Sequence, residues 1–328
     1  MAAFNSTDLS NAFKTLDEKR LLLRAQPRLV HGRWAEVAEF KGWNVYSLRR
    51  YTQLSAATTA LGEGKTPDEV TLANPTQVTI TPAAYGSWMG YSDRAQLASY
   101  DPVISTMSAL LGDQAGLTVD TLIRNTVTAG ATADYAGGAT TRATIDRQND
   151  KIAYVDWVQN YVSLLAQNAR KIGGKFICIM HPYTLEAFMT DTTFVTLFTR
   201  AGGDAMRDGL MGTIFDCDVY ISSNARSYAS AGANSEDIYT MLFIGAESYG
   251  AAGFVGRMFD YNIDGAGPEA DEGMTGQEKS PIQLIINDLG ETGFDPLKQR
   301  GTVGWLGYHG DSVLNANFVR VLEHATSF

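Results

Sequence analysis

The longest regular pattern of apolar and polar residues runs from Asp101 to Gly130. Apolar positions recur here every three or four residues, which predicts one helix over residues 102–129, about 40 Å long. Asp101 is a good N-cap, Pro102 suits the first helical position, and Gly130 is placed to end the helix. The predicted buried stripe is Val103, Met107, Leu110, Leu111, Ala115, Val119, Leu122, Ile123, Thr126 and Val127, and the predicted polar side is Ser105, Ser108, Asp113, Thr118, Asp120 and Arg124. Because it carries so little charge, we expect this spine helix to lie along a sheet or a neighbouring subunit.

Before the spine, residues 43–51 and 76–81 alternate as strands do, and residues 85–91 form another extended run. Residues 54–74, between the first two, contain few large apolar side chains and several turn residues. Connections longer than about 12–15 residues are usually functional or disordered. We therefore expect an extended hairpin that projects from the body and is ordered by a neighbouring molecule. The preceding residues, 1–42, read as an arm that is too thin to be a domain.

After the spine, residues 154–172 have helical spacing, and the predicted buried face is Val155, Val158, Val162, Leu165, Ala169 and Ile172. Gly173 and Gly174 should close this helix, and residues 175–180 read as a buried strand. Further strands are predicted at residues 215–222, 239–244, 282–286, 302–308 and 317–322, the last two as a hairpin. Helices and strands interleave without the regular alternation of a doubly wound sheet, so the predicted fold class is α+β.

Composition limits the classes of function. The 328 residues carry a formal net charge of −10, which argues against a protein that binds nucleic acid tightly. The charged fraction is 19%, below the usual quarter, as expected if partners cover part of the surface. Cys178 and Cys217 lie in apolar runs and are interpreted as buried thiols; a disulfide between them is less favoured in a reducing cytoplasm. No signal-like start or membrane-spanning apolar run is present, so we expect a soluble protein with no membrane partner.

Catalytic and metal-binding patterns are absent from the sequence. The four histidines are far apart and have no ligand-like spacing, and no nucleophile elbow or phosphate-binding loop occurs. His181, before Pro182, fits a satisfied histidine at a turn better than a catalytic one. The acidic loop at residues 260–281 contains Asp264, Glu269, Asp271 and Glu272, but a solvated loop is favoured over a calcium site because their spacing does not match an EF-hand. We expect no enzyme, no metal and no cofactor.

Several segments, in this order, resemble one family. They are residues 49–54 and 57–67, Tyr85-Gly86, residues 101–103 and 120–124, Tyr135-Ala136-Gly137-Gly138 with Arg142-Ala143, His181-Pro182 and, most specifically, residues 293–305. Together they are similar to the major capsid proteins of tailed bacteriophages, of the type found in N-four-like podophages. The resemblance implies the Hong-Kong-97-like capsid fold, shared with the herpesvirus shell floor.

The domains that the resemblance implies are an N-terminal arm (1–42), an extended loop (43–92), a peripheral domain with the spine helix (93–150), an axial domain (151–294) and C-terminal strands that return to the peripheral domain (295–328). The implied function is a subunit of hexamers and pentamers in an icosahedral shell around packaged double-stranded DNA. Implied partners are other copies of the chain, a portal at one vertex and separate scaffolding or decoration proteins. The implied location is the virion, after assembly in the host bacterial cytoplasm.

Charged residues of the extended loop are the candidate inter-subunit contacts: Arg49, Arg50, Glu63, Lys65, Asp68 and Glu69. The two arginines suit pairing with a neighbour's carboxylates better than phosphate binding in an acidic chain. Nothing in the sequence supports an isopeptide cross-link at Lys65, and the short arm indicates no fused scaffolding domain. Two alternatives remain: the shell protein of an encapsulin-like nanocompartment, and a hydrolase that uses His181.

Overall fold

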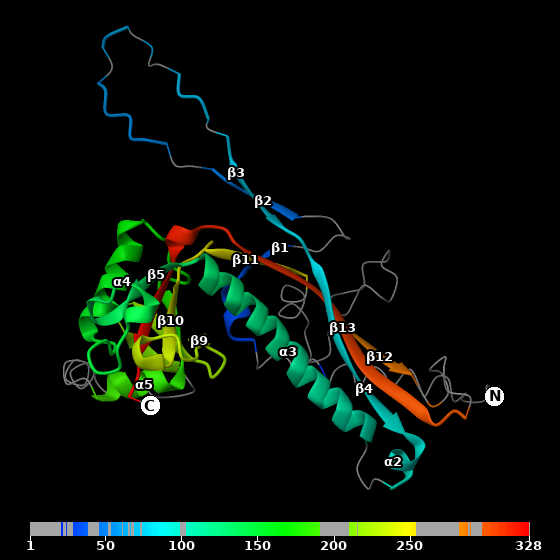
Figure 1. Cartoon of the computed structure of the whole chain (residues 1–328). Helices are drawn as coiled ribbons and strands as arrows, with labels where there is room; N and C mark the ends of the chain where they lie inside the picture. The colour runs from blue at the N-terminus through cyan, green and yellow to red at the C-terminus, as the bar shows by residue number, and fades with distance from the viewer. Residues whose placement is uncertain are drawn as a thin grey trace.

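The computed structural model describes residues 21, 24, 29–38, 46–51, 54–60, 62–64, 66, 69–72, 74–98, 103–190, 210–214, 216–253, 282–287, 289 and 297–327. One β-sheet runs alongside a long helix, a second β-sheet lies at the C-terminal end of that helix, and a narrow hairpin projects away from both (Figure 1). This mixture of helix and sheet confirms the predicted α+β class.

The first sheet is built around the long strand β13 (Arg300–Val313). On one side β13 pairs along most of its length with β4 (Ala83–Ser92), and on the other with β12 (Ile282–Asn287) and then β11 (Tyr249–Gly253). These pairings are antiparallel, whereas the short β1 (Glu36–Ala38) is parallel to β11. The short helix α2 (Asp93–Ala98) follows β4.

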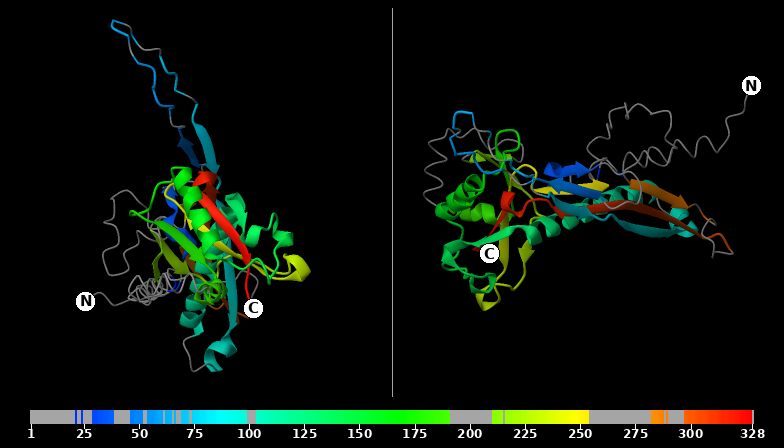
Figure 2. Two further views of the ribbon diagram at one scale, coloured as in Figure 1. Left: turned by 90° about the vertical axis from the view of Figure 1, so that its left-hand side faces the viewer. Right: turned by 90° about the horizontal axis from the view of Figure 1, so that it is seen from above.

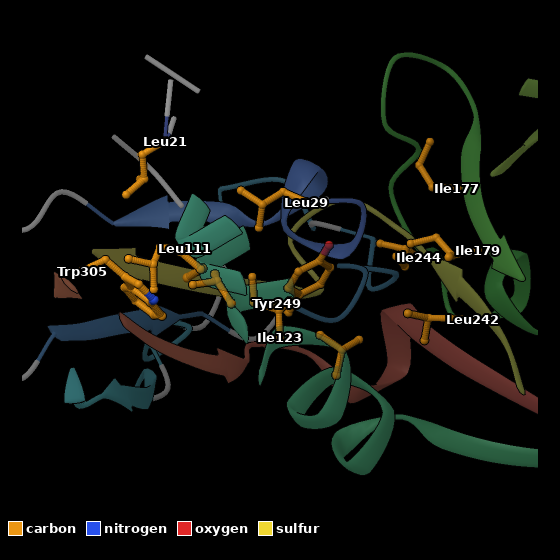
Figure 3. Close-up of a cluster of buried hydrophobic side chains, with 14 of the residues drawn as sticks. Leu21, Leu29, Leu111, Ile123, Ile177, Ile179, Leu242, Ile244, Tyr249 and Trp305 are labelled. Atoms are coloured by element: carbon orange, nitrogen blue, oxygen red, sulfur yellow. The ribbon is translucent and has the colours of Figure 1, made fainter. Parts of the chain in front are cut away.

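The spine helix α3 (Val103–Gly130) packs along this sheet and leads directly into the second one (Figure 1). Its inner face meets Val303 and Trp305 of β13, and the indole N–H of Trp305 donates to Gln114 Oε1 at 3.3 Å. The core that begins here continues between the sheets to β6, β10 and β14 (Figure 3). One hydrophobic cluster therefore joins both ends of the subunit.

The second sheet has the strand order β5 (Thr132–Tyr135), β14 (Val319–Ala325), β10 (Ile238–Ile244), β6 (Phe176–Met180), β8 (Cys217–Ile221) and β7 (Leu210–Ile214). The two-residue β9 (Ser227–Tyr228) also pairs with β10. Helices α4 (Tyr154–Ala166) and α5 (Pro182–Thr190) pack on this sheet (Figure 1). Strands β6 and β10 are buried at every residue, which explains why their sequences are apolar except for Thr240. Short 3-10 turns occur at His31–Trp34 (η2), Ala136–Gly138, Arg142–Thr144, Ala233–Ser235 and Ala316–Phe318.

The projecting hairpin begins with β2 (Tyr46–Arg50) and returns through β3 (Thr76–Ile80), which pair antiparallel from Tyr46 opposite Ile80 to Arg50 opposite Thr76. Between these strands, the described residues form no regular strand and reach well beyond the body (Figures 1 and 2). The predicted extended hairpin is thus present.

Several predictions within the fold need correction. Strands β13 and β14 do not form a hairpin: β13 belongs to the first sheet and β14 to the second, because a turn at residues 314–318 redirects the chain. Helix α4 ends at Ala166, six residues early. Gly173 and Gly174 (φ 58° and 87°) do not cap it but form a two-residue turn that joins Ile172 to Lys175.

The faces of the two long helices also differ from prediction. Ser108 and Asp120 of α3, placed on the polar side, are fully buried, whereas Leu110 is half exposed. In α4 the packed face is Trp157, Asn160 and Leu164, and three of the six residues predicted to be buried, Val155, Val162 and Leu165, are exposed. Apolar spacing alone does not show which of two apolar faces meets the core.

Three predicted features lie outside the described residues: the N-cap and first position of the spine (Asp101, Pro102), the acidic loop at 260–281 and most of the N-terminal arm. The domain boundaries remain a prediction.

Candidate assembly surfaces

The charged residues predicted to make inter-subunit contacts are dispersed along the projecting hairpin. Arg49, Glu63 and Glu69 are exposed, while Lys65 and Asp68 lie outside the described residues. Arg50 points back to the body, where its guanidinium donates to the carbonyl oxygen of Leu314 at 3.3 Å. The structure therefore does not gather these residues into one site. The described ones are spread along the projecting hairpin.

Sequence reasoning overlooked the exposed apolar residues of the same hairpin. Tyr51, Leu54, Val70 and Leu72 are 54%, 56%, 70% and 67% exposed. A two-stranded hairpin alone is marginal in water, and these side chains gain nothing while they face solvent. The sequence of this segment has no strand-like alternation, in keeping with its described residues, which form no regular strand. The hairpin has the properties of a surface that becomes buried on another molecule.

The root of the hairpin, in contrast, is packed tightly on the first sheet. Ile80 is 1% exposed and lies over Gly310 of β13, where an added Cβ would be 2.9 Å from Ile80 Cγ2. On the neighbouring strand, an added Cβ at Gly250 would be 3.1 Å from Leu48 Cδ1. These glycines let the two hairpin strands approach the sheet backbone closely, so the hairpin leaves the body in a defined direction.

A buried carboxylate, that of Asp120, holds the spine helix against two distant segments of the chain. Asp120, in the middle of the spine, is fully buried and accepts four hydrogen bonds from distant parts of the chain. The donors are the backbone N–H groups of Val30 and His31 (2.8 and 2.7 Å), His31 Nδ1 (2.9 Å) and Asn224 Nδ2 (2.7 Å). The Tyr249 hydroxyl donates to the His31 carbonyl. One carboxylate thus joins the spine to η2 and to the loop after β8.

Arginines extend this network along the same side of the spine. Arg124 donates to the backbone and side-chain oxygens of Asn224 at 2.8 and 2.9 Å. Arg226 in turn donates to Asn125 Oδ1 at 2.5 Å. The spine is therefore connected by several polar contacts to residues 224–226, which precede β9.

Burial by itself would raise the pKa of Asp120. The hydrogen bond from His31, the positive charge of that ring when protonated, the hydrogen bond from Asn224 and the His31 backbone N–H outweigh burial, and the pKa of Asp120 lies below its usual range. The carboxylate therefore stays ionised at neutral pH. The sequence offered no direct sign of this, because a lone aspartate on a helix is more often solvated.

His181 has the structural role that the sequence favoured. It precedes α5, and its Nδ1 accepts the backbone N–H of Tyr183 at 3.2 Å, in the manner of an N-cap. Its ring also contacts those of Tyr183 and Tyr239, and burial lowers its pKa. Within the described residues, no three His, Cys, Asp or Glu side chains are arranged to hold a metal ion.

Cys178 and Cys217 are buried free thiols on neighbouring strands. Burial raises the pKa of both, that of Cys217 to about 12, so neither is a reactive thiolate at neutral pH. None of the described helices is long and apolar enough to cross a membrane.

Comparisons with known proteins agree with this arrangement. A family model described as phage capsid protein matches residues 75–317. No curated protein sequence matches the chain. Among solved structures, the capsid of Ralstonia phage GP4 is 15% identical, with 91% of this chain and 89% of that chain covered and a TM-score of 0.61. The capsid of cyanophage Pam1 is 13% identical (93% and 92% covered, TM-score 0.62), and that of Helicobacter pylori bacteriophage KHP30 is 14% identical (90% and 89% covered, TM-score 0.57).

The family match covers well over half of the chain, so the protein belongs to the phage capsid protein family. Its fold is the Hong-Kong-97-like capsid fold of these shells. It is a major capsid protein, a non-enzymatic structural component of the virion that assembles with other copies into a shell. The encapsulin and hydrolase alternatives are not favoured.

Proposed function

We propose that this subunit forms the hexamers and pentamers of a closed icosahedral shell around the double-stranded DNA of a tailed phage. The observation that carries the proposal is the projecting hairpin, whose apolar residues Tyr51, Leu54, Val70 and Leu72 are not covered by the subunit itself. In a shell, the hairpin of one subunit lies across the next, a heterologous contact that closes into rings. Each hairpin then buries the apolar surface that is exposed in the isolated chain.

The charged residues of the hairpin surround this apolar contact. Arg49, Glu63, Lys65, Asp68 and Glu69 pair with charges of the neighbouring subunit and fix the register of the hairpin, as polar rims do at other interfaces, whereas Arg50 holds the hairpin to its own subunit through Leu314. The first sheet and spine act as a peripheral domain and the second sheet as an axial domain. The net charge of −10 suits an inner wall that does not bind the packaged DNA tightly.

Further partners and the place of assembly follow from the same proposal. A portal occupies one vertex, separate scaffolding or decoration proteins assist or cover the shell, and assembly takes place in the cytoplasm of the host bacterium. The support for these is the family alone. The N-four-like subtype stays a prediction from the sequence.

The test is the particle size of the purified protein, measured by negative-stain microscopy and gel filtration over a range of concentrations. We expect closed shells, or hexamers and pentamers that assemble as the protein is concentrated. A monomer that never assembles, even with scaffold protein or crowding agents, would contradict the proposed function.

A further inference from the structure

Helix α4 has an unusual composition for a helix at the surface. Of its 13 residues, Asp156 alone is charged, and it lies in the first turn, where its carboxylate accepts the backbone N–H of Ala153 at 3.0 Å. A surface helix normally has charged residues opposite its packed face, whereas a helix that is apolar on both sides is normally covered on both. The sequence of α4 therefore indicates a second covered face.

The inner face of α4 is already filled. Trp157 and Leu164 are fully buried, and the Trp157 ring packs edge-on against Phe243 of β10, with the ring centres 4.9 Å apart. Tyr161 packs in the same way on Phe176 of β6. The packing of the helix on the second sheet thus does not need the remaining apolar residues.

The outer face of α4 carries a row of those residues. Val155, Val162 and Leu165 are 58%, 50% and 40% exposed, and the exposed Gln159 between them is uncharged. At the helical repeat of 100° per residue, Val155, Gln159, Val162 and Ala166 share one side of the helix. Val155, Val162 and Leu165 belong to the stripe that the hydrophobic pattern predicted to be buried.

A groove of about 690 Å³ adjoins this row. It lies between α4, which contributes Val162 and Ser163, and the chain at β5 and just after it, which contributes Tyr135 and Ala139. Its lining mixes apolar and uncharged polar side chains with the carboxylates of Asp134 and Asp156. The carboxylates already have partners, Arg320 for Asp134 and the Ala153 N–H for Asp156. Both carboxylates therefore already accept hydrogen bonds from their own chain.

We infer that the outer face of α4 and its groove form a contact between subunits, occupied by a second copy of this chain through a different part of its surface. This inference rests on the proposed function. Two observations favour a copy of the same chain as the occupant. The chain assembles with itself into a shell, and the exposed row on α4 is uncharged although the whole chain carries −10, so a second acidic copy that approaches this row meets no like charge on it. This contact is separate from that of the hairpin, which leaves the body elsewhere (Figure 1).

The experiment compares Val162→Asp and Val155→Asp with the wild-type protein in the concentration-dependent assembly assay. Both substitutions place a charge on the outer face, and an aspartate at position 155, in the first turn, is also favourable to the helix. We expect each variant to remain folded, with an unchanged circular dichroism spectrum and melting temperature, and to need at least about tenfold more protein to assemble.

The matched control is Ala229→Asp, which adds the same charge at an exposed turn after β9, at a residue that is neither on α4 nor in the lining of the groove; it should assemble like the wild type. Folded variants of both valines that assemble at the wild-type concentration would overturn the inference, and would show that another protein or solvent faces α4. If the wild type itself does not assemble, the proposed function fails instead. If Val162→Asp lowers the melting temperature, the assembly concentration of Val155→Asp alone tests the inference.

Discussion

Asp120 is the residue whose contacts reach furthest through the chain. Its carboxylate accepts four hydrogen bonds, from residues 30, 31 and 224, so all its described partners are donors. In Asp120→Asn, the side-chain NH₂ group must face at least one of the N–H groups that now donate to the carboxylate. The negative charge beside His31 is also lost. Breaking such a buried pair costs about 3–5 kcal/mol, and we expect the free energy of unfolding at pH 7 to fall by that amount in urea titrations.

The pH dependence of the stability that Asp120 contributes follows from the direction in which its pKa is shifted. The pKa of Asp120 is lowered in the folded protein, so its contribution is present above the pKa of about 3.9 in the unfolded chain and is lost as the pH falls through the folded-state value. The stability curves of wild type and Asp120→Asn should therefore converge below about pH 4. Asp113→Asn, a partly exposed change on the same helix, is the control, and an equal loss there would contradict this role for Asp120.

At the scale of elements, the spine depends on a glycine that its own helical propensity disfavours. Alanine at position 112 would favour the helix by about 1 kcal/mol, but its Cβ would lie 2.4 Å from the carbonyl oxygen of Leu21. We expect Gly112→Ala to lower the melting temperature, because the segment at Leu21 must move away from the spine. The control is Thr118→Ala, at a partly exposed position of the same helix. It raises helical propensity without a steric conflict and should leave the melting temperature unchanged or raise it. A higher melting temperature for Gly112→Ala would show that the Leu21 contact is dispensable.

At the scale of the whole molecule, folding and assembly should be separable. The described residues near the hairpin tip are exposed, and the root is packed on the first sheet, so deletion of residues 65–69 should leave the melting temperature of the subunit unchanged. The same deletion should abolish or strongly reduce shell formation, measured by light scattering and microscopy. A variant with Gly-Ser residues at 65–69 keeps the length and separates the contribution of reach from that of Lys65 and Asp68. Normal shells from the deletion would contradict a role for the tip.

The sequence by itself determined the elements whose signal is local. The spine, the strands β3, β4, β6, β10 and β12, and the existence of a long hairpin all follow from spacing and turn residues, because helix and strand periods are set by backbone geometry. Family membership was also accessible, through short segments in a fixed order. The structural role of His181 followed from its place before Pro182.

Tertiary structure alone decided which face of an element is covered and which distant residues meet. α4 has two apolar faces, and the sheet beneath it selected Trp157 and Leu164, leaving Val155 and Val162 outside. β13 and β14 separated into different sheets because each had other strands to pair with. Asp120 became a buried junction because residues 30, 31 and 224 bring donors to it from afar. Such choices depend on contacts between residues far apart in the chain, which no local pattern encodes.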